Sequence, residues 1–195
     1  MIKVGLTGGL GSGKTIVTSL FQVLNIPVYI ADEESKKLTD SSSTIRQKLI
    51  RLFGESIYTD QGLDRPLLAS HIFNDAKKLH QVNEIIHPEV NRHFLAWTKH
   101  LPGEICVIES AILFESGFNH IVDVSLMVYA PMPLRIERAL ERDPAIARKA
   151  VIQRINSQMS DEEKKDLSDF LIINDNRHAI IPQVHSFLKS IFPAD

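Results

Sequence analysis

Cysteine is nearly absent from this sequence, which contains one among 195 residues. The single thiol, Cys106, cannot close a disulfide within the chain, and no cysteine and histidine spacing matches a zinc site or a redox pair. Proteins without disulfides are typical of reducing compartments. The composition therefore favours a location in the cytoplasm.

Long apolar runs are also missing. No run reaches the roughly 18 to 20 residues that a membrane-spanning helix needs. The first residues, Met-Ile-Lys-Val-Gly-Leu-Thr-Gly-Gly, have no apolar segment of a secretory signal before the glycines. We therefore expect no membrane partner, and we expect the first residues to belong to the fold.

Neither sign of charge predominates, because the sequence contains 22 Lys and Arg residues and 24 Asp and Glu residues, for a net charge of -2. With a pI near 6.4, the chain has no bulk attraction for nucleic acid, and we expect any anionic ligand to be small. Hydrophobic residues at 44% and charged residues at 24% are typical of a folded globular protein. The length fits one domain with a small insertion.

Short apolar runs alternate with segments of helical periodicity along the chain. The runs predict strands at residues 2–6, 27–31, 105–108, 124–130 and 170–173. The periodic segments predict a helix near the C-terminus and others at residues 15–24, 33–39 and 131–142. Strands that alternate with helices predict an α/β fold with a parallel five-stranded sheet covered on both faces.

Two segments interrupt this alternation. Residues 41–100 have few strand signals and show helical periodicity, so we predict a helical insertion. Residues 142–165 are polar and rich in lysine and arginine, which is the composition of a mobile basic lid. The remaining residues, about 1–40, 101–141 and 166–195, form the predicted core of a single unit.

One motif between the first predicted strand and the first predicted helix carries the chemistry. Residues 8–15 read Gly-Gly-Leu-Gly-Ser-Gly-Lys-Thr and satisfy G-x-x-x-x-G-K-[ST], the phosphate-binding P-loop. Glycines allow successive backbone N–H groups to turn inward around phosphate oxygens. The following helix adds unpaired N–H groups and the positive end of its dipole. The motif therefore predicts a site for ATP or GTP.

The P-loop also assigns roles to its polar side chains. The ammonium of Lys14 is expected to reach the β- and γ-phosphates, and the Thr15 hydroxyl is the expected ligand of Mg²⁺. Magnesium binds through few protein oxygens together with the phosphates. The predicted ATP-binding residues of this segment are Gly8, Gly9, Gly11, Ser12, Gly13, Lys14, Thr15 and Ile16.

A P-loop occurs in kinases, GTPases and motor ATPases, so the rest of the sequence has to discriminate among them. The guanine-specific N-K-x-D element is missing, and so is the D-x-x-G switch of signalling GTPases. A P-loop combined with a helical insertion and a basic lid favours a small-molecule kinase. Two alternatives stay open, a nucleoside or nucleotide kinase and a non-catalytic regulatory module that binds ATP.

Further short motifs follow the P-loop in order along nearly the whole chain. They are Val28 to Asp32, Gly62-Leu63-Asp64-Arg65, His87-Pro88, Leu113-Phe114-Glu115, Arg138, Arg142-Asp143, Arg154-Ile155, Gln158-Met159 and Asp169 to Asn174. Together these motifs resemble the dephospho-coenzyme A kinase family. The sequence departs from the family pattern at Ile30, at Ser168 and at Glu109-Ser110-Ala111.

The resemblance implies transfer of the γ-phosphate of ATP to the ribose 3′-hydroxyl of dephospho-coenzyme A, the last step of coenzyme A synthesis. It places Asn174 on the ATP side. It places Arg65, His87 and Arg138 on the acceptor side. The alternatives are a surface ion pair for Arg65 and, for His87 before Pro88, a helix-boundary residue or a packing residue.

Two side chains besides Lys14 are predicted to act on the reacting groups. Asp32 follows a strand at its carboxyl end, so it can orient the acceptor hydroxyl and take its proton, although it could instead cap the next helix. Arg142 ends a predicted helix, and a guanidinium suits the charge of the transferring phosphoryl group. Glu109, Glu115 or neither of them could hold a water on Mg²⁺, and the sequence does not decide among these alternatives.

Overall fold

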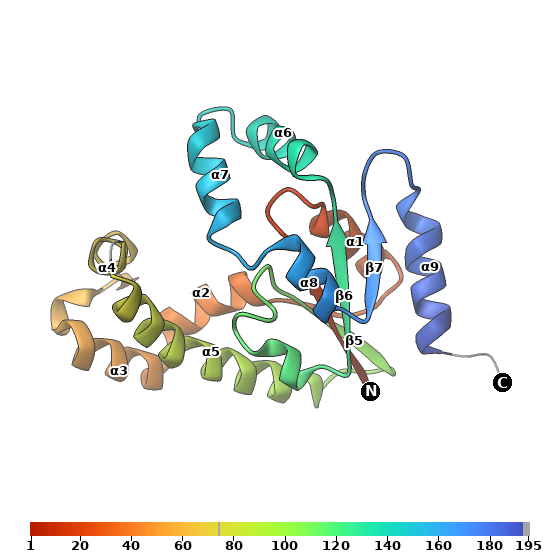
Figure 1. Ribbon diagram of the computed structural model, residues 1–195. Coiled ribbons are helices and arrows are strands. Elements are labelled where there is room, and N and C mark those ends of the chain that lie inside the picture. The colour runs from red at the N-terminus through yellow and green to blue at the C-terminus, as the bar shows by residue number, and fades with distance from the viewer. Residues whose placement is uncertain (74, 193–195) are drawn as a thin grey trace. The chain divides into compact units, whose positions relative to one another are not determined.

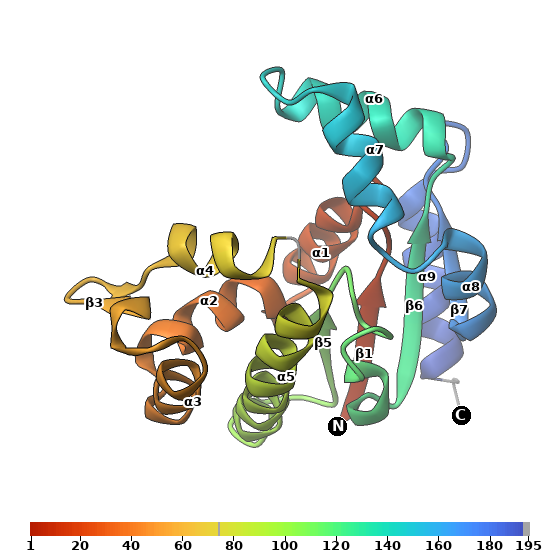
Figure 2. The same cartoon turned by 60° about the vertical axis from the view of Figure 1, so that its left-hand side comes forward.

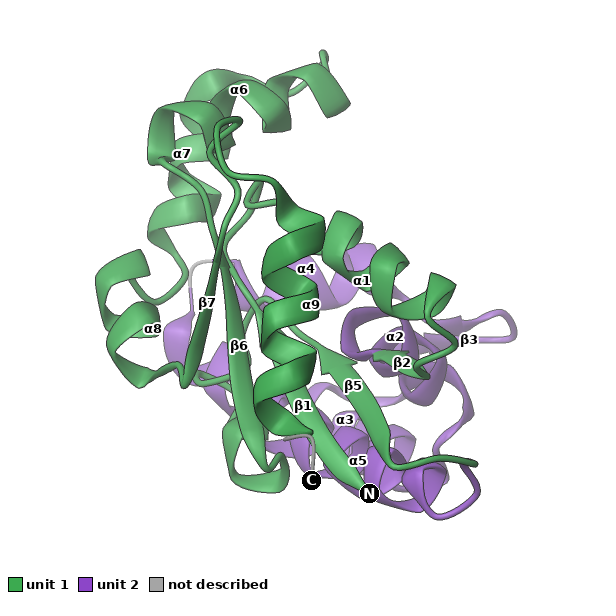
Figure 3. Cartoon of the chain, turned by 90° about the vertical axis from the view of Figure 1, so that its right-hand side faces the viewer, with its two compact units in different colours: residues 1–29, 102–195 green, residues 30–101 purple. Residues whose placement is uncertain are grey.

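The computed structural model describes residues 1–73 and 75–192 of the chain. The chain divides into two compact units, the first made of Met1–Tyr29 and Pro102–Asp195 and the second of Ile30–Leu101 (Figure 3). The second unit begins earlier than the predicted insertion and therefore includes Asp32. The predicted core also extends over residues 193–195, which lie outside the described residues.

A five-stranded sheet with the strand order β2-β5-β1-β6-β7 is the centre of the first unit (Figure 3). Its strands are β1 (Ile2–Thr7), β2 (Val28–Ile30), β5 (Ile105–Glu109), β6 (Val124–Tyr129) and β7 (Phe170–Ile173). Strand β1 runs parallel to both β5 and β6, and β6 runs parallel to β7. The predicted α/β fold with a five-stranded sheet is confirmed.

Helices of the first unit cover the sheet and continue beyond it. They are α1 (Lys14–Val23), the short 3-10 helix η2 (Phe118–Ile121), α6 (Met132–Arg142), α7 (Arg148–Asn156), α8 (Asp161–Leu167) and α9 (Ile180–Ile191). Figures 1 and 2 show α6 and α7 beyond the arrowhead of β6, at the carboxyl ends of the strands. Ligands of open parallel sheets bind at this end.

One face of the sheet is buried under α1 and α9. Leu6 of β1 and Val107 of β5 lie in an apolar core with Phe21 of α1 and Phe187 of α9. The rings of Phe21 and Phe187 meet edge to face, with centroids 6.3 Å apart. Side chains alternate along a strand, so Cys106 belongs to the opposite face, where it is also fully buried. The packing fixes β1 and α1, the two elements that the P-loop joins.

The second unit is mostly helical, as its periodicity predicts. It contains α2 (Ala31–Ser41), α3 (Ser43–Phe53), the 3-10 helix η1 (Glu55–Ile57), α4 (Arg65–Ile72) and α5 (Ala76–Thr98). A small antiparallel hairpin of β3 (Tyr58–Thr59) and β4 (Gly62–Leu63), which was not predicted, joins η1 to α4. Ile45, Leu49 and Val82 are buried in a separate apolar core.

The start of α2 also differs from the sequence prediction, and the predicted lid contains helices. Helix α2 begins at Ala31, directly after β2, rather than at Glu33. The predicted basic lid forms α7 and most of α8, and Lys164, counted among its basic residues, is fully buried. Within residues 1–73 and 75–192, no helix is both long and apolar enough to cross a membrane.

Candidate active site

The P-loop joins β1 to α1 in a tight turn. Gly8, Gly11 and Gly13 have φ angles of 148°, 77° and 96°, which residues with a Cβ rarely adopt. Gly13 is the N-cap of α1, and none of the side chains that the structure describes caps this helix. An uncapped helix N-terminus presents N–H groups and a positive dipole end to an anion. The predicted phosphate cradle therefore has the expected geometry.

Asn174, directly after β7, contacts the P-loop through its side-chain amide. Its Nδ2 donates a hydrogen bond to the carbonyl oxygen of Ser12 at 2.8 Å. A Cβ on Gly13 would lie 2.0 Å from the same nitrogen, so only glycine allows this approach. Arg138 of α6 donates to the backbone and side-chain oxygens of Asn174, each at 3.2 Å, and to Oδ1 of Asn176 at 2.6 Å. Arg138 is thus joined to the P-loop through Asn174.

Ser12 contributes a buried hydroxyl that points to a ligand. The residue is 1% exposed, and among the described residues its Oγ has no hydrogen-bond partner. A buried hydroxyl without a partner is costly, and such groups in native proteins usually meet a ligand or a water. A phosphate oxygen in the P-loop would satisfy it.

Lys14 and Glu109 bring opposite charges to the P-loop. The ammonium of Lys14 donates to the carbonyl oxygen of Gly8 at 2.8 Å and lies 3.6 Å from Oε1 of Glu109. Glu109 ends β5, beside Leu6 of β1 in the parallel register. Both side chains are mostly buried, at 13% and 15% exposure. The Glu109 carboxylate therefore lies at the carboxyl end of β5, beside the Lys14 ammonium of the P-loop.

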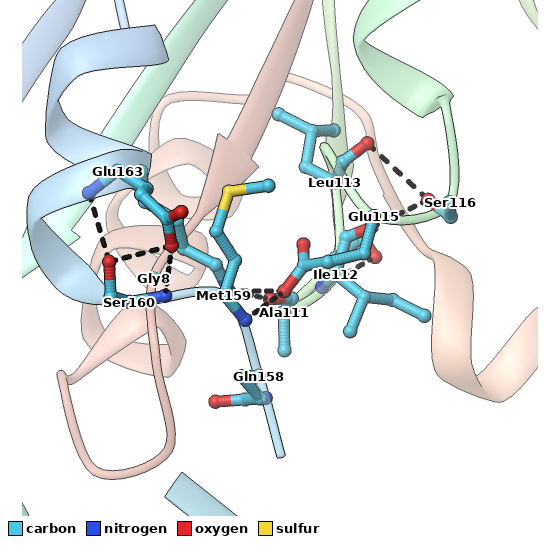
Figure 4. Close-up of polar contacts among 12 residues, drawn as sticks. Gly8, Ala111, Ile112, Leu113, Glu115, Ser116, Gln158, Met159, Ser160 and Glu163 are labelled. Atoms are coloured by element: carbon cyan, nitrogen blue, oxygen red, sulfur yellow. Dashed lines mark hydrogen bonds and ion pairs between the residues drawn. The ribbon is translucent and has the colours of Figure 1, made fainter. Parts of the chain in front are cut away.

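Glu115, the other acid considered for the metal, has different partners. Its Oε1 accepts a hydrogen bond from the backbone N–H of Met159 at 2.9 Å (Figure 4). The same oxygen lies 3.0 Å from the Lys164 ammonium. Lys164 also donates to the carbonyl oxygen of Ala111 at 2.6 Å. Glu115 therefore ties the loop after β5 to the start of α8.

A groove of about 760 Å³ lies next to Asn174. Residues of α1 and of the segment after β7 line it, among them Ile16, Leu20, Asn174, Arg177 and Ile180. Ile16 is 51% exposed, and Thr15 beside it is also exposed. The volume lies in the range of sites for small molecules and cofactors. The predicted residues Ile16 and Asn174 are thus brought to one groove.

The second unit holds Asp32. It is the second residue of α2, and it is exposed. The N-cap is Ile30, and no described side chain caps the helix, so the alternative of a capping role for Asp32 is wrong.

Arg65 and His87, also in the second unit, differ in their surroundings. Arg65 donates to Oδ2 of Asp40 at 2.7 Å and to the carbonyl oxygen of Lys36 at 3.0 Å, so the ion pair considered for it is present. Its side chain is still 44% exposed. His87 lies inside α5 rather than at a helix boundary, and burial lowers the pKa of its imidazole. His87 is therefore suited to hydrogen bonding without charge near neutral pH.

Comparison with known proteins decides the family. The family model described as dephospho-CoA kinase matches residues 2–179. The chain belongs to the dephospho-CoA kinase family. A dephospho-CoA kinase of Bacteroides fragilis strain YCH46 is 47% identical over 192 residues, which cover 98% of this chain and 93% of that protein.

Solved structures agree with this family in fold. TT1252 from Thermus thermophilus is 29% identical and superposes with a TM-score of 0.81 over 98% of this chain and 96% of its own. A dephospho-CoA kinase from Campylobacter jejuni is 22% identical, with a TM-score of 0.70 over 97% and 96% of the two chains. The predicted P-loop kinase fold and the resemblance to dephospho-CoA kinases are both confirmed.

Membership of the family also confirms the predicted activity class. This dephospho-CoA kinase family member is an ATP-dependent kinase of the last step of coenzyme A synthesis. The alternatives of a nucleoside or nucleotide kinase and of a non-catalytic module lose their support.

Arg142, the predicted lid arginine of the kinase, is the last residue of α6 and is exposed.

Two charged residues that support the P-loop of the kinase, Arg135 directly and Asp161 through Arg135, were not predicted from the sequence. Arg135 is buried in α6 and donates to the carbonyl oxygen of Leu10, and Asp161 at the start of α8 pairs with it. No local signal marks either residue, because Arg135 is one of several charged residues in α6 and Asp161 is one of three acids in the first turn of α8.

Proposed function

We propose that this chain transfers the γ-phosphate of Mg²⁺-bound ATP to the ribose 3′-hydroxyl of dephospho-coenzyme A. The products are coenzyme A and ADP. The observation that carries the ATP site is the P-loop with its uncapped α1, the buried Ser12 hydroxyl and the neighbouring Lys14 ammonium. The acceptor is supported by membership of the dephospho-CoA kinase family.

The residues at the P-loop suit a magnesium ion. The Thr15 hydroxyl would bind it directly, and Glu109, 3.6 Å from Lys14, would hold one of its waters. When bound, the ion supplies positive charge to the β- and γ-phosphate oxygens. Glu109 is proposed over Glu115, because Glu109 lies beside the Lys14 ammonium of the P-loop, whereas Glu115 contacts Met159 and Lys164.

The chain's own groups would lower the barrier by placing positive charge around the transferring phosphoryl group. The Lys14 ammonium and the N–H groups at the start of α1 would stabilise the phosphate oxygens, and Arg142 would add a guanidinium from the lid. Asp32 would accept the proton of the 3′-hydroxyl as its oxygen bonds to the γ-phosphorus. The bond between that phosphorus and the bridging oxygen of ADP breaks in the same transfer.

The remaining predicted residues are proposed as binding groups. Asn174 and Arg138 would border the nucleotide, since Asn174 contacts the P-loop and Arg138 contacts Asn174. A direct contact of Arg138 with the acceptor stays a prediction. Arg65, through the exposed part of its side chain, and His87, through hydrogen bonding, would bind the acceptor.

A coupled assay of ADP release tests the proposal. We expect ADP to appear only with dephospho-coenzyme A, with one coenzyme A formed for each ADP. Adenosine and AMP serve as matched controls, because they share the adenine and ribose but lack the pantetheine arm. ADP release that is as fast without an acceptor, or faster with AMP, would contradict the proposal.

Removal of magnesium tests the metal assignment. Chelation by EDTA is expected to stop the reaction, and added Mg²⁺ should restore it. The Thr15→Ala variant should need a higher Mg²⁺ concentration for half-maximal rate. An unchanged magnesium requirement in that variant would remove Thr15 from the metal site.

A location in the cytoplasm, favoured by the cysteine content, also stays a proposal.

A further inference from the structure

Arg135 carries a positive charge into the interior of the first unit. Among the described residues it has the largest fully buried side chain, at 2% exposure. A buried guanidinium is tolerated only when it is paired and hydrogen-bonded. Its partners therefore indicate what the residue is for.

The first partner is the P-loop. The Nε of Arg135 donates to the carbonyl oxygen of Leu10 at 2.8 Å. A Cβ on Gly9 would lie 2.1 Å from Nη2 of Arg135. The P-loop pattern leaves residue 9 open to any side chain, and the φ angle of Gly9 is not positive. The glycine at this position is thus explained by the guanidinium packed against it.

The second partner is Asp161, the first residue of α8. Its carboxylate forms an ion pair with Nη1 of Arg135 and is 18% exposed. The start of α8 is itself well ordered, because Ser160 and Glu163 form a capping box, visible in Figure 4. Asp161 is thus presented to Arg135 by a fixed helix end.

The same segment binds the other side of the Leu10 backbone. Oε1 of Gln158 accepts a hydrogen bond from the N–H of Leu10 at 3.2 Å. The N–H and the carbonyl of Leu10 are therefore both held, one by Gln158 and one by Arg135. Further along, Lys164 and Glu115 anchor the segment to the loop after β5. The orientation of the backbone on either side of Leu10 is set by these side chains.

We propose that Arg135 is a positioning residue that sets the P-loop backbone for ATP, with Asp161 as its counter-ion. Arg135 precedes the lid in the chain and Asp161 lies close to its end, so their ion pair also fixes both ends of the lid at the P-loop. Arg135 acts on the nucleotide through Gly9 and Leu10. The inference rests on the proposed function only for its activity readout, because ATP binding can be measured separately.

Three variants distinguish an effect of Arg135 on the P-loop backbone from an effect on the stability of the fold alone. Arg135→Gln removes the charge and the bond to Leu10, and we expect the KM and Kd for ATP to rise about tenfold, the effect of losing one charge-assisted hydrogen bond. The KM for dephospho-coenzyme A should stay unchanged. Arg135→Lys keeps the charge and should give an intermediate KM for ATP. Arg51→Gln, an exposed arginine in the second unit, is the matched control.

The double variant Arg135→Gln/Asp161→Asn gives the decisive comparison. Removing both charges should restore the melting temperature lost in either single variant, because no unpaired buried charge is left. The KM for ATP should stay high, because the Leu10 carbonyl still lacks its donor. Recovery of the KM together with the melting temperature would overturn the proposal.

The remaining outcomes are also informative. If Arg135→Gln alone does not fold, Arg135→Lys and the double variant carry the test by the same measurements. A folded Arg135→Gln variant with normal ATP affinity would overturn the proposal. Titration with a fluorescent ATP analogue measures the Kd for nucleotide without turnover, so the role of Arg135 is tested separately from the proposed function. A wild type that binds ATP but does not phosphorylate dephospho-coenzyme A would refute the function and leave the role of Arg135 to be read from Kd.

Discussion

The side-chain amide of Asn174 donates a hydrogen bond to the carbonyl oxygen of Ser12 across 162 residues of sequence. This contact brings the end of β7 to the P-loop. Arg138 binds the other side of Asn174, so one amide joins α6, β7 and the loop. The relationship has a direct consequence for ATP affinity.

Asn174→Ala is expected to weaken ATP binding and lower stability together. Asn174 is 5% exposed, and the loss of its amide removes the donor to the Ser12 carbonyl oxygen and one acceptor of the Arg138 guanidinium. Removing one partner of a buried hydrogen bond costs about 1–3 kcal/mol. Urea unfolding and ATP titration measure the two effects. Gln22→Ala, an exposed amide of α1, is the control, and equal effects in both variants would contradict the argument.

Gly9→Ala should raise the KM for ATP, because its Cβ would collide with the Arg135 guanidinium, 2.1 Å away. The same change should cost much less in the Arg135→Gln background, because the shorter side chain leaves room. A kinetic double-mutant cycle measures this coupling. Purely additive effects of the two substitutions would show that Gly9 is not required by Arg135.

Asp32→Asn should lower turnover about 10²–10⁴-fold, the usual contribution of a general base. ATP affinity should hardly change, because the substitution keeps the shape of an exposed side chain. Steady-state kinetics with saturating dephospho-coenzyme A checks this. Glu33→Gln, the exposed neighbouring acid, is expected to retain full turnover. Similar losses in both variants would point to a general electrostatic effect of the α2 N-terminus.

Asp40 makes the stability of the chain sensitive to acid. Burial tends to raise the pKa of Asp40, but the hydrogen bonds from Arg65 and from the Leu63 backbone, with the Arg65 charge, bring it below 3.8. A lowered native pKa gives stability that is present above pH about 4 and is lost as the pH falls through the native value. The effect is modest, because the pair is partly exposed.

Asp40→Asn tests this sign. The variant should be less stable than the wild type at pH 7, and the difference should shrink as the pH is lowered toward 2. Urea unfolding at several pH values measures it. A difference that stays constant with pH would show that the carboxylate charge of Asp40 is not the cause.

The P-loop and the fold class could be predicted because their signals are local. Glycines at positions 8, 11 and 13 with Lys14 define a pattern within eight residues, and alternating apolar runs define the strands. The same local signals gave too late a start for α2. A strand that runs directly into a helix at Ala31 has no turn residue to mark the change.

The supports of the P-loop could not be predicted, because they depend on distant pairs. Arg135 matters through Leu10 and Asp161, which are 125 and 26 residues away. Lys164 belongs to a polar, basic segment whose composition predicts solvent exposure, yet it is fully buried beside Glu115. Only the packed structure shows which charges of a polar segment face inward.

Cys106 lies fully buried in β5, and burial raises the pKa of its thiol to about 11. A thiol in this state is nearly inert toward disulfide reagents at pH 8, and it reacts when the sheet opens. The rate at which Cys106 is labelled therefore measures how often β5 opens. Bound nucleotide should lower this labelling rate, because a ligand of the native state makes opening rarer. Rapid labelling of the folded protein, unaffected by nucleotide, would show that β5 is open to solvent.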